Sequence, residues 1–229
     1  MHSVSVIIPA LNEEEPIADV VRAVLATGIP REVIVVDNQS SDRTAERART
    51  AGARVVSAPR GYGRACAAGV RAASAECEVL VFLDGDGSDC AELMPHLVDP
   101  IFEGGYDFVI GSRTRGEREP GSMNAQQVFA GYLAGWLIRP LYGVRYTDMC
   151  PFRAIRRDAL EKLGMKEETY GWNLEMQMRA ARADLRILEV PVNHRCRTGG
   201  ESKVSGTLRG TFVAGTRIVA TLFRVAAGG

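Results

Sequence analysis

The sequence predicts an α/β protein with a mostly parallel central sheet flanked by helices. Apolar, β-branched runs at 4–9, 32–37 and 78–83 have the composition and length of buried strands. Segments with helical spacing separate these runs through about residue 100, and strands that alternate with helices form parallel sheets covered on both faces. The 229 residues suffice for one large domain with a substantial core, and no repeat or linker interrupts them.

The individual elements follow from these apolar runs and from the residues that end them. The expected strands are 4–9, 32–37, 54–56, 78–83, 106–111, a short strand within 146–155, and a proline-containing edge strand at 185–192. The expected helices are one that ends at Gly28, one that ends at Ala51, those at 65–75, 127–141 and 157–163, and one that begins at Trp172. The expected N-caps are Asn12, Ser41 or Asp42, and Asn173.

The composition is that of an ordinary globular protein, with 46% apolar and 24% charged residues. The formal net charge is zero, so no general attraction to nucleic acid is expected. The five cysteines lack C-x-x-C spacing, which favours a reducing cytoplasm over a zinc or disulfide framework. No signal peptide and no apolar stretch of about 18 residues occurs, so we expect a cytoplasmic protein. The segment 195–224 contains six basic residues and one acidic residue, Glu201. This excess of positive charge indicates an anionic partner or a solvated basic helix.

The stretch 82–89, F-L-D-G-D-G-S-D, is the centre of the functional interpretation. It brings Asp84, Asp86 and Asp89 into a tight turn directly after a buried strand. Ligands of open α/β sheets bind at the carboxyl ends of strands, and hard divalent cations take oxygen ligands of this kind. We therefore expect a site for a metal ion and a diphosphate. For D-x-D alone, a solvated acidic turn is an equally good interpretation.

Three other segments bear on function. The glycine-rich loop 60–64 could hold phosphate at the start of a helix, whereas the fingerprints of dinucleotide-binding and P-loop proteins are absent from the sequence. The charged loop 112–121 is long for a compact domain, which favours a functional role. The helix 127–141 is apolar around much of its girth, so it packs in the core or contacts something apolar, and we favour the core.

Seven motifs occur in a fixed order along the chain. They are V-I-I-P-A-L-N-E-E at 6–14, V-V-D-N-Q-S-S-D at 35–42, G-Y-G-R-A at 61–65, F-L-D-G-D-G-S-D at 82–89, G-S-R at 111–113, D-M-C-P-F-R-A at 148–154 and S-K-V-S at 202–205. Together they resemble the family 2 glycosyltransferases with the GT-A fold, and within them the polyprenyl-phosphate (dolichyl-phosphate) mannosyl- and glucosyltransferases. This resemblance implies a Rossmann-like sheet in a single catalytic domain. We divide this domain into a nucleotide-sugar half (1–121), an acceptor half (122–206) and a C-terminal amphipathic helix (207–229).

The resemblance also implies roles for individual residues. The residues expected to bind the nucleotide sugar are Pro9, Leu11, Glu13, Asp37, Gly63 and Asp84. The residues expected to hold Mg²⁺ or Mn²⁺ are Asp84, Asp86 and Ser88. The residues expected at the acceptor phosphate are Ser112, Arg113, Arg153, Ser202 and Lys203. The expected catalytic residues are Asp86, Glu175 and Arg113, and the histidines His2, His96 and His194 are interpreted as surface or packing residues.

The expected reaction is the inverting, metal-dependent transfer of mannose or glucose to a polyprenyl phosphate at a membrane surface. GDP-mannose or UDP-glucose would be the donor, and a cation would offset the charge of the departing diphosphate. An acceptor phosphate has a second pKa near about 6, so it is largely ionised and needs positioning by arginines more than deprotonation. Membrane contact would be peripheral, through the basic C-terminal segment.

Two alternatives remain at this point. A soluble or polysaccharide acceptor would react through a hydroxyl, and Glu175 would then be the first candidate for the general base. A non-catalytic module that binds nucleotide sugars would keep the fold without the reaction. One departure from the family pattern affects the donor site, since Asn38 and Gln39 stand where relatives often carry D-G.

Overall fold

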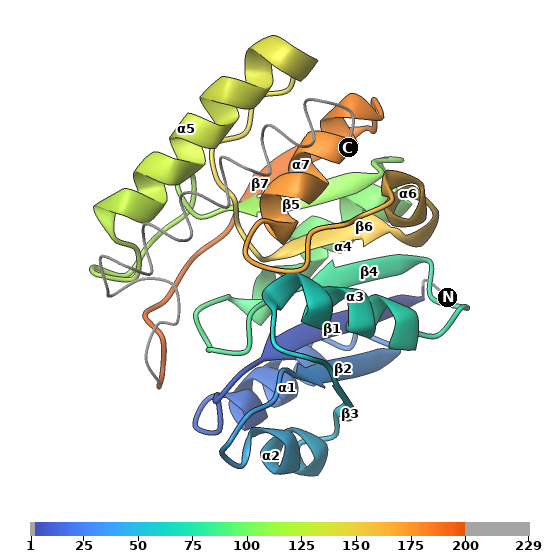
Figure 1. Ribbon diagram of the computed structural model, residues 1–229, viewed down its shortest axis with the longest axis vertical. Helices are drawn as coiled ribbons and strands as arrows, with labels where there is room; N and C mark the ends of the chain where they lie inside the picture. Colours follow the sequence, from blue (N-terminus) through green and yellow to red (C-terminus); the bar gives the residue numbers. More distant parts are fainter. Residues whose placement is uncertain (1–2, 200–229) are drawn as a thin grey trace.

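The computed structural model describes residues 3–199, and it contains one seven-stranded sheet (Figure 1). The strands are β1 (Val4–Ala10), β2 (Glu32–Asp37), β3 (Arg54–Ser57), β4 (Val79–Phe82), β5 (Phe108–Ser112), β6 (Arg153–Arg156) and β7 (Ile187–Pro191). Their order is β3-β2-β1-β4-β6-β5-β7. All neighbouring pairs are parallel except those of β6, which is antiparallel to both β4 and β5. The predicted fold class is confirmed.

Helices cover both faces of the sheet. They are α1 (Ile17–Ala26), α2 (Thr44–Thr50), α3 (Tyr62–Ala72), α4 (Met94–Phe102), α5 (Ala125–Tyr142), α6 (Arg157–Leu163) and α7 (Trp172–Arg182), with a short 3₁₀ turn, η1 (Ala91–Leu93). In Figure 1, α3 and α7 lie in front of the sheet and α4 lies behind it. Because both faces are covered, every residue of the central strands β1 and β4 is buried, as the uninterrupted apolar runs predicted.

The connection between β1 and α1 differs from the prediction. Asn12 does not cap the helix, because α1 begins only after Pro16 and the Asn12 backbone has a φ of 51°. The Asn12 side chain instead accepts a hydrogen bond from the Ser41 backbone N–H at 2.8 Å. The loop after β1 is thus tied to the loop after β2, and both loops stand at the carboxyl ends of their strands.

The prediction of Asn173 as an N-cap is wrong, and the prediction of Asp42 as an N-cap is partly right. The N-cap of α7 is Gly171, so Asn173 lies inside the helix. The Asp42 carboxylate accepts the backbone N–H of Thr44, the first residue of α2, at 3.0 Å, although Arg43 occupies the N-cap position. The proline-containing strand β7 lies at the sheet edge as expected, where an unpaired edge tolerates Pro191.

The second half of the chain is not a separate layer. Strand β6 inserts between β4 and β5, so it extends the sheet that the first half begins. Strand β6 pairs with the strand that ends at the acidic turn, which brings the segment before it close to that turn. The proposed C-terminal helix 207–229 lies outside the described residues.

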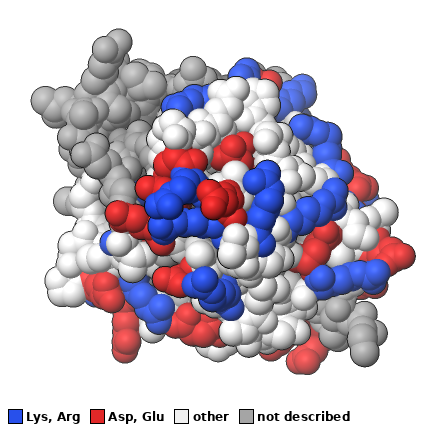
Figure 2. All heavy atoms as spheres, turned by 90° about the horizontal axis from the view of Figure 1, so that it is seen from below, with Lys and Arg blue, Asp and Glu red and all other residues white. Residues whose placement is uncertain are grey.

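Charged residues are interspersed on the surface rather than segregated by sign. Figure 2 shows acidic and basic side chains side by side on the face seen from below the view of Figure 1. The cysteines are all free thiols, and four of them are buried. Among residues 3–199, no helix combines the length and apolar character that crossing a bilayer requires.

Candidate active site

A cavity of about 530 Å³ opens at the carboxyl ends of β1 and β4. Seven of its lining residues belong to the predicted site: Pro9, Leu11, Glu13, Asp84, Asp86, Ser88 and Arg113. The cavity is also lined by residues outside that predicted set, among them Asn38, Arg60, Tyr62, Asn124, Gln127, Tyr170, His194 and Arg197. The cavity therefore gathers residues from both halves of the chain at the edge of the sheet where ligands of α/β proteins bind.

The acidic turn after β4 forms one wall of this cavity. The backbone N–H of Asp84 donates to the Asp89 carboxylate at 3.0 Å, which closes the turn. Ser88 donates to the Asp86 carboxylate through its backbone N–H at 2.9 Å and through its hydroxyl at 2.6 Å. The Tyr62 hydroxyl, at the start of α3, donates to Asp84 at 3.1 Å. The turn is thus held in shape by its own hydrogen bonds.

The carboxylates of this turn strongly perturb one another. Burial, followed by the charges of Asp86 and Asp89, raises the pKa of Asp84 well above its ordinary value. Burial also raises the pKa of Asp89 to about 7. A positive charge placed among these groups would relieve the repulsion, which is the environment expected around a bound cation.

The turn fits a divalent ion that shares its coordination with a substrate. No group of three His, Cys, Asp or Glu side chains within residues 3–199 forms a complete metal site. Magnesium is commonly bound through one or two carboxylates together with substrate phosphates and water. Asp84 and Asp86 can supply those carboxylates, and a diphosphate in the cavity can supply the remaining oxygens.

The segment after β7 crosses the acidic turn and closes the cavity. The backbone N–H of Arg195 donates to the Ser88 carbonyl at 2.9 Å, and that of Thr198 donates to the Asp86 carbonyl at 3.3 Å. The Arg197 guanidinium lies 2.8 Å from the Glu13 carboxylate and 3.4 Å from the Asp86 carboxylate. It therefore joins the loop after β1 to the loop after β4. Before the structure, only the excess of basic residues from 195 onward hinted at this contact.

His194 lies in the same segment and corrects an expectation. It was interpreted as a surface or packing residue, but it lines the cavity and is only 6% exposed. Its Nδ1 lies 3.8 Å from the Asp89 carboxylate and has no hydrogen-bond partner among the described residues. Burial, and then the charge of Arg113, lower the pKa of His194 to about 4. A neutral imidazole therefore faces the acidic turn at neutral pH.

Arg113 also lines the cavity, and a buried carboxylate fixes its position. Its Nε and one terminal nitrogen donate to the two oxygens of Asp148 at 2.7 and 2.8 Å. Burial alone would lower the pKa of Arg113, but these hydrogen bonds raise it, so the guanidinium stays charged. Burial alone would likewise raise the pKa of Asp148, which Arg113 instead holds below its ordinary value. The Arg113 guanidinium, partnered by Asp148, is thus held in a fixed orientation in the cavity wall.

Five predicted site residues within residues 3–199 do not line the cavity: Ser112, Arg153, Gly63, Asp37 and Glu175. Ser112 is fully buried, and its hydroxyl bonds to Thr147 at 2.7 Å. Arg153 is also fully buried, and its guanidinium donates to the backbone carbonyls of Cys150 and Asn173. Burial lowers the pKa of Arg153, and its contacts are those of a structural residue. Gly63 and Asp37 stand beside the cavity rather than in its wall.

Gly63 and Asp37 have structural contacts that explain their residue types. A Cβ on Gly63 would lie 2.1 Å from the Glu167 carbonyl, because the first turn of α3 packs directly on the loop 166–170. The Asp37 carboxylate accepts the backbone N–H of Ser40 at 3.2 Å, which shapes the turn after β2. Ser202 and Lys203 lie outside the described residues.

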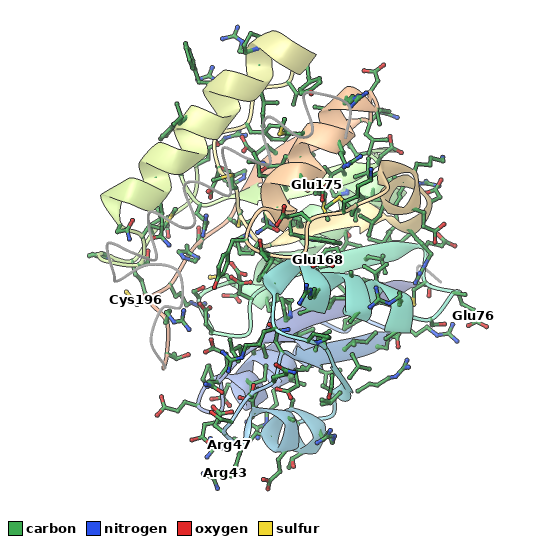
Figure 3. All side chains as sticks on the ribbon, viewed as in Figure 1. Arg43, Arg47, Glu76, Glu168, Glu175 and Cys196 are labelled. Carbon is green, nitrogen blue, oxygen red and sulfur yellow. The ribbon has the colours of Figure 1, made fainter. Side chains whose placement is uncertain are left out.

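Glu175 is the site residue whose placement differs most from the prediction. It is fully buried at the start of α7 and does not line the cavity (Figure 3). Its carboxylate accepts the backbone N–H groups of Lys166 and Glu167 at 3.0 and 2.6 Å, and it pairs with Arg179 at 3.0 Å. These contacts fix the loop that carries Tyr170 to the cavity, so in this structure Glu175 positions a loop.

Replacing Glu175 by glutamine tests this correction. We expect a loss of stability of about 1–3 kcal/mol, because a buried, charge-assisted network is weakened. We expect kcat to fall less than tenfold, whereas removal of a general base costs about 10²–10⁴. Urea denaturation and steady-state kinetics measure the two effects. Glu161→Gln, on the exposed side of α6, is the matched control, and a thousandfold loss of kcat in a stable Glu175→Gln protein would restore the base.

Asn38 shows how the departure from the family pattern is accommodated. Its side-chain amide donates to the Pro59 carbonyl at 2.6 Å and accepts the Gly61 backbone N–H at 2.9 Å. The following residue, Gln39, has a φ of 64°. Asn38 therefore connects the loop after β2 to the glycine-rich loop, and it shapes the cavity by holding that loop in place.

Comparisons with known proteins identify the family of this chain. The model of the family described as glycosyl transferase family 2 matches residues 5–164. An uncharacterised glycosyltransferase of Mycobacterium tuberculosis is 40% identical over 215 residues, which cover 93% of this chain and 94% of the relative. An undecaprenyl-phosphate mannosyltransferase of Micrococcus luteus is 33% identical over 224 residues, covering 90% and 89%. A dolichyl-phosphate hexose transferase of Haloferax volcanii is 36% identical over 199 residues, covering 85% and 84%.

Solved structures give the same assignment for the fold. Glucosyl-3-phosphoglycerate synthase of Mycobacterium tuberculosis in complex with phosphoglyceric acid has a TM-score of 0.79 at 25% identity, covering 99% of this chain and 80% of that one. The same enzyme with Mn²⁺ and UDP-glucose has a TM-score of 0.78 at 25% identity, covering 99% and 79%. The chain therefore belongs to glycosyl transferase family 2, and it is a nucleotide-sugar glycosyltransferase with the GT-A fold.

Proposed function

We propose that this enzyme transfers mannose or glucose from a nucleoside-diphosphate sugar to a polyprenyl phosphate at the cytoplasmic surface of a membrane. The observation that carries the proposal is the pairing of two charged centres in one cavity. An acidic turn suited to a cation and a diphosphate faces a buried, permanently charged Arg113 suited to a second phosphate. The names of two relatives, at 33% and 36% identity, point to polyprenyl-type phosphate acceptors.

The donor would occupy the side of the cavity formed by the loops after β1 and β2. Pro9 and Leu11 offer apolar surface for a base, and Glu13 is positioned to accept hydrogen bonds from a ribose. Asp37 acts from behind this wall by shaping the turn after β2. GDP-mannose and UDP-glucose both remain candidate donors, and the UDP-glucose complex of the solved relative supports a nucleoside-diphosphate hexose.

The acidic turn would hold the diphosphate through a divalent cation, Mg²⁺ or Mn²⁺. Asp84 and Asp86 would be its carboxylate ligands, and Ser88 fixes the orientation of Asp86 by two hydrogen bonds. The bound ion would supply Lewis-acid stabilisation of the diphosphate leaving group. Arg197, which reaches both Glu13 and Asp86, would place a second positive charge beside the departing diphosphate. The Mn²⁺ complex of the solved relative supports the assignment.

Arg113 would orient the acceptor phosphate for attack on the sugar. A phosphate monoester is largely ionised at neutral pH, so the attacking oxygen needs no general base. The buried position of Glu175 agrees with this chemistry. The charge of Arg113 is fixed by Asp148, so the acceptor phosphate would be held at a defined angle with little reorganisation.

A soluble acceptor that carries a phosphate is the second candidate. The solved relative bound to phosphoglyceric acid favours it, because the same arginine could hold the phosphate of a small molecule. Such an acceptor would react through a hydroxyl and would need a general base. Glu175 does not line the cavity, so another residue would have to serve, and the neutral imidazole of His194 in the cavity lining is a candidate.

A product assay distinguishes the candidates. The enzyme is incubated with GDP-mannose or UDP-glucose, with Mg²⁺ or Mn²⁺, and with either polyprenyl phosphate in detergent or 3-phosphoglycerate. We expect a lipid-linked sugar that is extracted into organic solvent with one of the two donors. We expect no product once EDTA has removed the metal, and product again once the metal is restored. Release of nucleoside diphosphate without any lipid product, together with a glycosylated phosphoglycerate, would reject the lipid acceptor and support the soluble one.

A further inference from the structure

Helix α5 has an inner face that packs closely on the rest of the enzyme. Gly131, Gly135 and Ile138, which follow one another at helical spacing, are buried. A Cβ on Gly135 would lie 1.9 Å from the Tyr146 carbonyl, so the helix backbone approaches the segment before β6 directly. The prediction that this helix packs in the core holds for this face alone.

The outer face of α5 is unusually apolar for a surface helix. Tyr132, Leu133 and Trp136 are 49%, 42% and 72% exposed. The helix sequence contains one charged residue, Arg139, and no acidic residue. An exposed helix face normally carries polar and charged side chains, and an exposed apolar cluster marks a surface that binds something. Figure 1 shows α5 at the periphery of the molecule, away from the central sheet.

The chemistry of this face is that of a membrane interface. Tyr132, Leu133 and Trp136 line a shallow hollow of about 440 Å³ together with Arg139 and Arg145, and none of its lining residues is acidic. Tryptophan and tyrosine prefer the boundary between lipid headgroups and acyl chains, because each ring joins an apolar body to a polar group. Arginines beside such rings attract anionic headgroups.

Helix α5 also reaches the active site at its other end. Asn124 and Gln127, at the beginning of α5, line the catalytic cavity. Trp136 follows Gln127 by nine residues, which corresponds to about 14 Å along the helix. A bilayer in contact with Trp136 would therefore bind the same helix whose first turn lines the cavity. A phosphate at the end of a membrane-embedded chain could reach Arg113 without leaving the bilayer surface.

We propose that the outer face of α5, defined by Tyr132, Leu133, Trp136 and Arg139, together with Arg145 just after the helix, docks this enzyme on a bilayer that contains anionic phospholipid. The proposal rests on the proposed lipid acceptor and identifies how that acceptor is reached. The expected contact lies on α5, whereas the sequence alone pointed to the basic C-terminal segment.

The two tryptophans allow a direct test. Trp136 is exposed and Trp172 is buried, so a change in fluorescence on addition of lipid reports the outer face of α5. The full chain is mixed with vesicles of phosphatidylcholine, with or without 30% phosphatidylglycerol. We expect a blue shift and quenching by brominated acyl chains with the anionic vesicles. Trp136→Phe should remove the shift, because only Trp172 remains.

Vesicle sedimentation then measures the contribution of each side chain. We expect Trp136→Gln to weaken binding about tenfold by removing interfacial apolar surface. We expect Arg139→Gln combined with Arg145→Gln to weaken binding to anionic vesicles at low salt by about fivefold for each charge removed. Leu25→Gln and Arg22→Gln, exposed positions on α1, are the matched controls and should bind as the unaltered chain does. Circular dichroism checks that each variant is folded.

The outcomes separate this proposal from the proposed function. In one outcome, the enzyme transfers sugar to polyprenyl phosphate in detergent, but Trp136→Gln binds vesicles as tightly as the unaltered chain. This result overturns the docking surface and supports the proposed function. Lipid-sensitive Trp136 fluorescence with no transfer to any polyprenyl phosphate overturns the function and supports the surface. If acrylamide does not quench Trp136 fluorescence in the absence of lipid, another part of the chain or a second copy covers the outer face of α5. That result also overturns the docking surface.

Discussion

Replacing Asp86 by alanine is expected to abolish turnover, and Asp86→Asn is expected to reduce kcat by at least about a hundredfold. The reason is electrostatic, because a group that stabilises charge in a polar active site contributes about 10²–10³ to kcat. Asparagine keeps the shape of the side chain and the contact with Ser88, but it removes the negative charge available to a cation. Initial rates with saturating donor and metal measure the effect.

A binding measurement separates the loss of metal from the loss of the fold. The unaltered enzyme should gain thermal stability from a nucleotide sugar with Mn²⁺, since ligands that bind the native state raise its apparent stability. Asp86→Asn should lose the part of this gain that depends on Mn²⁺. Glu92→Gln, an exposed carboxylate just beyond the acidic turn, is the matched control and should behave as the unaltered enzyme does. Normal turnover in Asp86→Ala would remove the metal role from this turn.

Breaking the pair between Arg113 and Asp148 is expected to cause the largest change in stability. Their side chains are only 12% and 1% exposed, and removing one partner of a buried pair costs about 3–5 kcal/mol because the other charge stays buried. Asp148→Asn should therefore lower the free energy of unfolding by about that amount. Arg113→Met should be similarly destabilised, and the double variant should recover part of the loss.

The same variants also test the acceptor site. Arg113→Lys keeps a positive charge but loses the two parallel hydrogen bonds to Asp148 that orient the guanidinium. The acceptor phosphate would therefore be held less precisely. We expect the KM for the acceptor to rise and the KM for the donor to stay nearly constant. Arg115→Lys, an exposed neighbour paired with Glu189 at 3.8 Å, is the control. A rise confined to the donor KM would instead place Arg113 at the diphosphate.

The active site was only partly predictable because the sequence carries two kinds of information about it. The acidic turn was predicted because Asp84, Asp86 and Ser88 are adjacent in sequence and follow a recognisable buried strand. Arg113 was found through a short motif at the end of another strand. His194 and Arg197 carry no local pattern, since a histidine and an arginine after an edge strand have many uses. Only the path of that segment across the turn reveals their place.

Residue type alone also misled the interpretation of buried charge. Arg153 is an ionisable group within a family motif, and the family resemblance also implied a catalytic role for the ionisable Glu175. In the structure, each satisfies backbone groups in the interior, where an unpaired donor or acceptor costs free energy comparable to a lost hydrogen bond. A sequence does not state whether a charged side chain faces a cavity or the core, because the answer depends on contacts with distant segments.

The sequence by itself determined the succession of strands and helices along the chain, the mostly parallel character of the sheet and the acidic turn at the end of β4. These features follow from local periodicity and from neighbouring residues. The tertiary structure decided that β6 enters between β4 and β5, that residues 194–197 close the cavity, and that α5 leaves Trp136 exposed. The first two features arise from contacts between segments far apart in the chain, such as Phe82 with Arg153 and Asp86 with Thr198, which local patterns do not encode.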